Sequence, residues 1–482
     1  MSVNTPHKSF LYEQVADKIT KLVEHRTLRP GDRIPSVRKM SSQQGISVST
    51  VLEAYYLLEN RGIIEAKSQS GFYVSPEPQE SWTQPKISNP PASANEVGVN
   101  DLVMEIAEMA QSHDIIQMGF AMPSTDLYPT QKLNRVLAST ARRLGQRTNV
   151  YDLPPGSEEL RRQLARRSLE WGCNLTSDEL VITCGATEAL NLCLRAVSKP
   201  GDIIAVDSPT HFGILGVIES LGLKTLEIPT HCGAGLSLDS LEAALTKHDV
   251  KACVFCLNSQ NPLGFIMPDE NKQQLVELLA SREIPLIEDD VYGDIYFGTS
   301  RPKVALAYDK QGLVMLCSSF SKTLAPGFRV GWVATGRYHK AIKQLKFSNS
   351  VGTPIVLQVT IAEFLRSGGY DYFLRRIRRT YERQNQFMSR AIRNYFPEGT
   401  WFTHPKGGTV VWVEFPAGFD ALNLFRAAAD ENIAIAPGPM FSPTRQYQNF
   451  IRLSYSEIWS DKVDRALIKL GKLVEQQMGS LE

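Results

Sequence analysis

The chain has 482 residues, of which 43% are hydrophobic and 21% are charged, a balance typical of a globular protein with large apolar cores. No run of about 18 apolar residues occurs and the first thirty residues carry charges throughout, so we expect neither a membrane-spanning helix nor a signal peptide. The seven cysteines are scattered, which fits a reducing cytoplasm better than a disulfide framework.

The net charge of +1 is unevenly distributed along the chain. Residues 1–76 carry ten Lys and Arg against seven Asp and Glu, a balance of +3, whereas the remainder carries −2. A positive excess in the N-terminal part has the sign expected for a segment that contacts DNA phosphates.

Three helices are expected within the first sixty or so residues. Apolar residues at helical spacing predict the first over residues 9–25. Ser36 is suited to cap a short second helix, and either Ser47 or Ser49 to cap a third over residues 50–61. The sequence therefore predicts a helical cluster at the N-terminus.

Two short strands are expected next, over residues 63–66 and 71–74, joined by a polar turn over residues 67–70. Three helices followed by a hairpin is the order of a winged helix-turn-helix. In that motif a turn joins two helices, here the second and the third, and the latter lies in the DNA major groove. Each hydroxyl residue here could also be a simple cap, and each arginine a solvated charge. The residues suited to contact DNA are two arginines and four hydroxyl residues: Arg33, Arg38, Ser36, Ser47, Ser49 and Thr50.

Three spaced motifs in this part of the chain, over residues 28–38, 45–51 and 69–74, resemble the GntR-type DNA-binding domain. The resemblance implies that residues 1–76 form a domain that binds double-stranded DNA.

A stretch rich in Pro and small polar residues, residues 77–100, predicts a linker. Beyond it, over residues 101–482, helical patterns alternate with short apolar runs. Continuous apolar strands between helices predict an α/β fold with a mostly parallel sheet covered on both faces. The predicted strands are residues 180–183, 203–206, 252–255, 285–288 and 313–316.

Cys253 and Cys256 have C-x-x-C spacing but lie in an apolar run that reads as a buried strand. Residues three apart on a strand face opposite ways, and no second pair of ligands accompanies them. We expect them to pack in the core and expect no metal site.

The segment of residues 319–332 suggests pyridoxal phosphate chemistry. Lys322 follows an apolar strand, and its amine can form a Schiff base with an aldehyde. Ser319, Ser321 and Arg329 are suited to hold a phosphate. The segment resembles the lysine signature of fold-type I aminotransferases, which implies the cofactor pyridoxal 5'-phosphate.

Other segments resemble further parts of that family's cofactor site, in the same order along the chain. Gly185, Ala186 and Thr187 open a helix whose N–H groups can bind the phosphate. The resemblance implies that Asp289 pairs with the pyridine nitrogen, with the adjacent Asp290 as the alternative.

Four more residues have roles that the resemblance implies. Tyr292 and Asn261 would contact the phenolic oxygen of the cofactor. Tyr151 would reach the phosphate of the neighbouring subunit in a homodimer. Arg452 would bind a carboxylate of the ligand in bidentate geometry.

At His211 the sequence departs from the family, which usually has an aromatic residue, commonly tyrosine, stacked on the cofactor ring. His211 would stack less extensively, Phe212 is the alternative, and an ordinary loop histidine is a third interpretation.

The order of the domains resembles the MocR subfamily of bacterial regulators, a winged helix-turn-helix fused to a fold-type I aminotransferase-like domain. This implies a mixed, mostly parallel sheet with helices on both faces, a small C-terminal α+β subdomain and a homodimer. We expect a cytoplasmic transcription regulator that senses a small amine or amino acid through aldimine exchange at Lys322. The alternative is a working aminotransferase with an appended DNA-binding module, because Lys322, Asp289 and Arg452 are all present.

Overall fold

The computed structural model describes residues 11–25, 27–29, 31–60, 63–67, 71–74, 84–85, 88–109 and 115–479. The chain divides into two compact units, Met1–Thr83 and Gln84–Glu482, with the division inside the predicted linker. Among the described residues, every helix is too short or too polar to cross a membrane.

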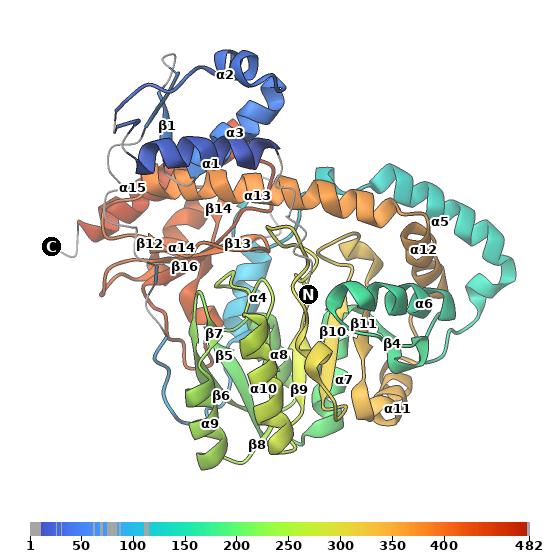
Figure 1. Ribbon diagram of the computed structural model, residues 1–482. Helices are drawn as coiled ribbons and strands as arrows, with labels where there is room; N and C mark the ends of the chain where they lie inside the picture. The colour runs from blue at the N-terminus through green and yellow to red at the C-terminus, as the bar shows by residue number, and fades with distance from the viewer. Residues whose placement is uncertain are drawn as a thin grey trace, which may run out of the picture. The chain divides into compact units, whose positions relative to one another are not determined.

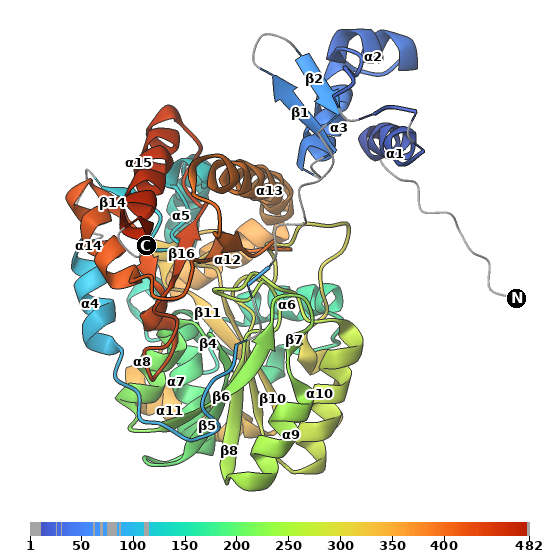
Figure 2. The ribbon, with the colours of Figure 1, turned by 90° about the vertical axis from the view of Figure 1, so that its left-hand side faces the viewer.

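The N-terminal unit has the predicted element order (Figure 2). Its elements are α1 (Leu11–Glu24), α2 (Val37–Gln44), α3 (Val48–Asn60), β1 (Ile64–Lys67) and β2 (Gly71–Val74). The two strands pair antiparallel. The residues predicted to form most of the turn between them, 68–70, lie outside the described residues, as do residues 61–62 at the end of the third predicted helix.

Local capping explains where the helices of this unit begin and end. The Ser36 hydroxyl accepts a hydrogen bond from the backbone N–H of Lys39, and Gly45 takes the left-handed conformation at φ 65° that ends α2. The Ser47 hydroxyl accepts from the N–H of Thr50 at 3.1 Å. The third helix therefore begins at Val48, two residues before the predicted start.

The core of the N-terminal unit is built from the inner faces of all three helices. Tyr55 is fully buried, and its hydroxyl donates to the Pro35 carbonyl at 2.6 Å, which ties α3 to the segment before α2. Val15 and Ile19 of α1 and Val74 of β2 pack in the same cluster. Burial of these side chains fixes the helices and leaves the polar residues outside.

The larger unit is organised around a mixed, mostly parallel sheet in the order β4-β11-β10-β9-β8-β5-β6-β7. Neighbours from β10 to β6 pair parallel, whereas β11 is antiparallel to both of its neighbours and β7 to β6. The five predicted strands are confirmed. The strand bounds are β4 (Leu180–Thr183), β5 (Ile203–Ser208), β6 (Lys224–His231), β7 (Gly235–Leu236), β8 (Val250–Phe255), β9 (Leu286–Asp289), β10 (Val314–Ser319) and β11 (Gly331–Ala334).

Helices cover both faces of this sheet, as predicted. Figure 2 shows α9 and α10 on one face and α7, α8 and α11 on the other. The helix bounds are α4 (Asn100–Met109), α5 (Thr130–Leu144), α6 (Glu158–Arg167), α7 (Gly185–Val197), α8 (Phe212–Ser220), α9 (Leu238–Lys247), α10 (Asp269–Ser281), α11 (His339–Ser350), α12 (Ile355–Arg366), α13 (Gly369–Tyr395), α14 (Ala421–Asp430) and α15 (Asp461–Met478).

The predicted C-terminal α+β subdomain follows the long helix α13. Its antiparallel sheet has the order β12-β13-β16-β15, and α14 and α15 accompany it. Figure 1 shows α13 extending from α12 to α15, so that one helix reaches both the main body and the subdomain. The strand bounds are β12 (Trp401–Phe402), β13 (Val410–Glu414), β15 (Ala436–Pro437) and β16 (Phe450–Ser454), with β14 (Ile433–Ala434) paired parallel to β3 (Ile116–Gln117).

Part of the segment predicted as a linker makes contacts within the larger unit. Asn95 pairs with Thr225 as an antiparallel bridge. The Ser88 hydroxyl accepts from the N–H of Thr230 at 2.9 Å. Residues 77–83 and 86–87 of the predicted linker lie outside the described residues.

Cys253 lies in β8 and Cys256 directly follows it, and both are buried. The Cys256 thiol lies 3.6 Å from the Asn258 carbonyl. Within the described ranges no group of three His, Cys, Asp or Glu side chains is arranged to hold a metal ion.

Candidate ligand site and DNA-binding surface

Lys322 lies in the turn that follows β10, at the carboxyl end of the parallel strands, where ligands of open α/β sheets bind. Its Nζ donates to the Ala121 carbonyl at 2.7 Å and lies 5.9 Å from the centroid of the Tyr292 ring. The N–H groups of Leu324 and Ala325 both donate to the Phe320 carbonyl at 2.9 Å and close the turn. The lysine amine therefore points into the unit.

The residues predicted to hold a phosphate come together from two distant parts of the chain. Arg329 Nη1 donates to the Ser321 hydroxyl at 3.2 Å, and the N–H of Ser321 donates to the Ser319 hydroxyl at 3.3 Å. A Cβ added to Gly185, the first residue of α7, would lie 2.4 Å from Arg329 Nη2, so only glycine allows this approach. The result is a cradle of hydroxyls, a guanidinium and a helix N-terminus, which suits a phosphate.

Ala186 and Thr187 lie in the first turn of α7, directly after Gly185. Their backbone N–H groups are among the first four of the helix, which have no partner within it. The structure thus places all three residues of the predicted phosphate loop at the helix end that faces Arg329.

The two adjacent carboxylates, Asp289 and Asp290, have different surroundings. Asp290 forms an ion pair with Arg301 and accepts from Asn258 Nδ2 at 2.9 Å, so its oxygens are engaged. Asp289 accepts from the N–H of Val291 at 3.2 Å. Loss of hydration raises the pKa of Asp289 to about 6, although the positive charge of Lys322 opposes the shift. The charge of Lys322 thus acts on Asp289, whereas Asp290 is paired with Arg301.

Two buried donors in the site, the Tyr292 hydroxyl and the Asn261 amide, fit the oxygen of a ligand. Within the described residues, neither the Tyr292 hydroxyl nor Asn261 Nδ2 has a hydrogen-bond partner, and both residues are buried. Buried donors are rarely left unpaired, because each costs about 1–3 kcal/mol. The pair therefore fits the phenolic oxygen of a pyridoxal ring, as the sequence predicts.

Arg452 extends from β16 into the same site and is almost fully buried. Its Nη1 donates to Asn261 Oδ1 at 3.2 Å and its Nη2 to the Gly119 carbonyl, whereas Nε has no partner among the described residues. Burial lowers the pKa of Arg452 to about 10, so the side chain stays positive at neutral pH. A buried cation without a bonded carboxylate suits an anionic ligand group.

His211 precedes α8 and feels the charges of both Arg452 and Lys322. Loss of hydration, with a smaller effect of these two cations, lowers the pKa of His211 to about 3, so its ring is neutral. The alternative, Phe212, packs edge-on against Phe120 and Phe441 at centroid distances of 5.7 and 5.9 Å. Phe212 thus contacts other aromatic rings, and the stacking of His211 on a cofactor ring stays a prediction.

Tyr151 lies outside this cluster, in the loop before α6, and 79% of it is exposed in the protomer. An exposed position suits the predicted contact with a neighbouring subunit, and that role stays a prediction.

Several residues at the site carry no sequence signal that would have identified them. The Ala121 and Gly119 carbonyls act through the backbone. Asn258 accepts from the fully buried Lys272 at 2.8 Å while it donates to Asp290. Such partners are set by tertiary packing between distant segments and not by local spacing.

In the N-terminal unit, three predicted DNA-contacting hydroxyls gather at the start of α3. Ser47 Oγ lies 2.7 Å from Ser49 Oγ and 2.8 Å from Thr50 Oγ1. Ser36, Arg33 and Arg38 are exposed. Arg33 lies against the start of β2, since a Cβ on Gly71 would be 3.3 Å from its Nη2. The predicted residues thus form an exposed polar surface on a compact core.

Comparison with known protein families accounts for both units. The family of bacterial regulatory proteins of the gntR type matches residues 11–74, and the aminotransferase class I and II family matches residues 124–470.

Relatives with the full architecture are regulators. The chain is 38% identical to the HTH-type transcriptional regulator YdcR of Escherichia coli and 35% identical to YjiR of the same organism, over 97% of this chain and 99% of each relative. The larger unit also resembles the solved α-aminoadipate aminotransferase LysN of Thermus thermophilus, in complex with N-(5'-phosphopyridoxyl)-L-leucine. The TM-score is 0.72 at 26% identity, over 80% of this chain and 100% of LysN.

Proposed function

Because the chain belongs to the family of GntR-type transcription regulators fused to an aminotransferase class I and II domain, the MocR-type architecture, we propose that it senses a small amine or amino acid at Lys322. The observation that carries this proposal is a pair of buried donors, Tyr292 Oη and Asn261 Nδ2, that have no partner among the described residues. The Tyr292 ring lies 5.9 Å from Lys322 Nζ, and Asn261 bonds to Arg452. These two donors fit a ligand that carries an oxygen atom, and the same chain has a unit of the gntR type.

We assign pyridoxal 5'-phosphate to this site. When bound, it supplies an aldehyde that joins primary amines reversibly and a ring that withdraws electrons. Ser319, Ser321, Arg329 and the N-terminus of α7 would hold its phosphate. The phosphopyridoxyl ligand of LysN supports the assignment by likeness.

The chain's own groups then have distinct parts. The Lys322 amine would hold the aldehyde of the cofactor and yield it to a ligand amine. Asp289, at the carboxyl end of β9, would stabilise a proton on the ring nitrogen. The buried Arg452 would select ligands that carry a carboxylate.

The N-terminal unit would bind double-stranded DNA through the start of α3, with Arg33, Arg38 and Ser36 at the phosphates or base edges. A homodimer would present two such helices, and the exposed Tyr151 would complete the partner's phosphate site. The protein would act in the cytoplasm, where bacterial DNA lies.

A ligand amine regulates DNA binding only if it favours one of two states of the protein, since coupling is a difference in affinity between states. The test is binding of labelled DNA from the protein's own promoter region, with and without a panel of amino acids and polyamines. A change of about fivefold or more in DNA affinity with one amine supports the proposal. DNA affinity that no amine alters, while the cofactor absorbance does shift, contradicts it.

Turnover is a second candidate function, because one site brings together Lys322, Asp289 and Arg452, the groups that transamination needs. Assay of released keto acid in the same samples separates the two. Keto acid produced in proportion to time indicates an aminotransferase, whereas a stable absorbance shift without keto acid indicates a sensor.

A further inference from the structure

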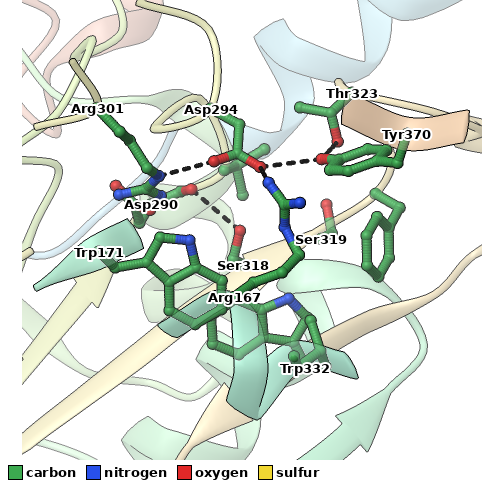
Figure 3. A pocket seen from close by; sticks show the side chains of 13 residues that line it. Arg167, Trp171, Asp290, Asp294, Arg301, Ser318, Ser319, Thr323, Trp332 and Tyr370 are labelled. Carbon is green, nitrogen blue, oxygen red and sulfur yellow. Dashed lines mark hydrogen bonds and ion pairs between the residues drawn. The ribbon is translucent and has the colours of Figure 1, made fainter. Parts of the chain in front are cut away.

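A group of buried charged side chains lines one small cavity together with Thr323, the residue after Lys322 (Figure 3). Arg301 contacts both Asp290 and Asp294, the latter at 2.7 Å. Arg167 Nη2 lies 3.7 Å from the other oxygen of Asp294. The cavity that they line has a volume of about 20 Å³, which is room for about one water and too little for a ligand. The group therefore acts by its contacts and not by binding a ligand.

Tyr370 connects this group to the lysine-bearing turn. Its hydroxyl lies 3.0 Å from Asp294 Oδ2 and 2.8 Å from Thr323 Oγ1. Its ring meets the Phe320 ring edge-on at a centroid distance of 5.8 Å. Phe320 and Thr323 flank Ser321 and Lys322 in the sequence, so one side chain contacts the turn on both sides of the lysine.

The charges fix the direction of these hydrogen bonds. Burial alone would raise the pKa of Asp294, but Arg301 and Arg167 hold it at about 2, so Asp294 is ionised and can only accept. The single proton of the Tyr370 hydroxyl must therefore go to Asp294. Thr323 then donates its own proton to the Tyr370 oxygen, and the hydroxyl next to Lys322 has one orientation.

The same side chain belongs to the helix that reaches the C-terminal subdomain. Tyr370 is the second residue of the 27-residue helix α13. Arg378, two turns further on, donates from Nε to the Asp294 carbonyl at 2.7 Å, and Asp371 accepts from Arg167 at 2.5 Å. The start of α13 is thus fastened to the loop after β9, while its other end packs beside α15 (Figure 1).

We propose that Tyr370 is a positioning residue for Lys322: its hydroxyl, fixed by Asp294, orients the turn through Thr323 and joins it to α13. This rests on the proposed function in one respect, that Lys322 holds the cofactor aldehyde until a ligand amine replaces it. A well-positioned lysine competes strongly with a free amine, because its effective concentration at the aldehyde is high. The contact between Tyr370 and Thr323 would thereby set the amine concentration at which the protein responds. It would also transmit a displacement of the Lys322 turn to α13.

The first arm of the test uses full-length protein without cofactor. Tyr370→Phe removes the hydroxyl and keeps the ring contacts. We expect hydrogen–deuterium exchange at the N–H groups of Leu324 and Ala325 to rise about three- to tenfold, the range for one lost hydrogen bond. Tyr372→Phe is the matched control, since Tyr372 lies on the same helix and is 68% exposed. We expect no change there.

The second arm uses protein loaded with pyridoxal phosphate and follows absorbance during amine titration. We expect the half-saturating amine concentration to fall about three- to tenfold in Tyr370→Phe, because Lys322 competes less well. Thr323→Val should match it, Thr323→Ser should retain the wild-type value, and the double variant Y370F/T323V should show no further change.

Unchanged exchange and an unchanged amine titration in Tyr370→Phe, equal to those of Tyr372→Phe, would overturn the proposal. So would a response to Thr323→Ser as large as that to Thr323→Val, which indicates packing and not the hydroxyl. A wild-type protein that binds no pyridoxal phosphate contradicts the proposed function alone, and the exchange arm still decides for or against Tyr370.

Discussion

The two units of this chain place their candidate functional side chains in opposite environments. In the N-terminal unit, Arg38 and Ser49 are exposed on the outside of a core that is centred on Tyr55. In the larger unit, Asn261 and Arg452 are almost fully buried, and each is bonded to a residue far away in the sequence. The candidate DNA-binding residues lie on the surface of a core that other residues form, whereas the candidate ligand-binding residues are part of the core of the larger unit.

The difference teaches where function and stability are coupled. A side chain on the exposed surface can change affinity for DNA with little effect on folding, because surface substitutions usually alter stability by less than about 0.5 kcal/mol. A side chain in the buried site stabilises its neighbours in the fold as well as binding a ligand. Substitutions on the exposed surface should therefore change binding alone, whereas substitutions in the buried site should change both binding and stability.

The largest expected effect is that of Lys322→Ala. Without the amine there is no covalent attachment of pyridoxal phosphate, so we expect complete loss of the absorbance band of the linked cofactor and of any response to amines. DNA binding should persist, because the residues proposed to contact DNA lie in the other unit. Absorbance spectra and gel shifts check this, and a linked cofactor in the variant would contradict the assignment of Lys322.

Next in size is Arg452→Met. Loss of a charged, bidentate partner should weaken binding of an amino acid about 10- to 100-fold. The matching amine without a carboxylate should bind as in the wild type, and absorbance titration with the two ligands measures both constants. An equal loss of affinity for both ligands would show that Arg452 stabilises the structure of the site and does not bind the carboxylate.

The buried site should also show in the pH dependence of stability. His211 has a folded pKa of about 3, below its ordinary value of 6.5, because it is removed from water. Below pH 6.5 the unfolded chain gains a proton that the folded chain does not. The contribution of His211 to the free energy of unfolding should therefore fall by about 1.4 kcal/mol per pH unit as the pH is lowered from about 6.5 toward 3.

His211→Phe removes that dependence while keeping an aromatic ring. Denaturation of the cofactor-free protein between pH 7 and pH 4, followed by tryptophan fluorescence, compares the two slopes. Parallel curves for wild type and variant would place a charged or solvated histidine at this position.

A smaller effect is expected from Arg38→Ala. The variant should bind promoter DNA about tenfold less tightly, and its dependence of log affinity on log salt should fall by about one, as for the loss of one phosphate contact. Thermal stability should not change. Lys21→Ala, an exposed cation on α1, is the control, and an equal loss in that variant would make the effect one of net charge.

The smallest effect is that of Ser47→Ala. Loss of the bond from the Thr50 N–H should lower the stability of the N-terminal unit by about 1 kcal/mol. Ser49→Ala removes a hydroxyl of the same group that accepts from no backbone N–H among the described residues, so it should cost less. Thermal denaturation followed by circular dichroism ranks the two, and the opposite ranking would move the cap to Ser49.

Local signals were enough to predict much of the fold. The caps at Ser36 and Ser47 and the left-handed Gly45 depend on neighbours within a few residues. The structure has Ser36 and Gly45 at the predicted ends of the second helix, and it has Ser47, one of the two predicted alternatives, at the start of α3. The strand–turn–lysine segment around Lys322 is equally local. The parallel strands followed from continuous apolar runs, because both faces of the sheet are covered.

Long-range partners were beyond such reasoning. Asp289 ends β9 and Asp290 follows it, and their long-range partners distinguish them: Asp290 bonds to Arg301 and Asn258. Tyr370 and Thr323 are 47 positions apart with no periodicity or motif between them. Their contact depends on how α13 packs on the lysine turn, which tertiary structure alone determines.

The central claim, that a small amine at Lys322 changes DNA binding, is tested most directly by one titration with two readouts. Cofactor absorbance and binding of fluorescent promoter DNA are recorded in the same sample as amino acids or polyamines are added. The account predicts that one ligand shifts both signals with the same half-saturating concentration, and that Lys322→Ala shifts neither. An absorbance shift that reaches saturation while DNA affinity stays constant would contradict it.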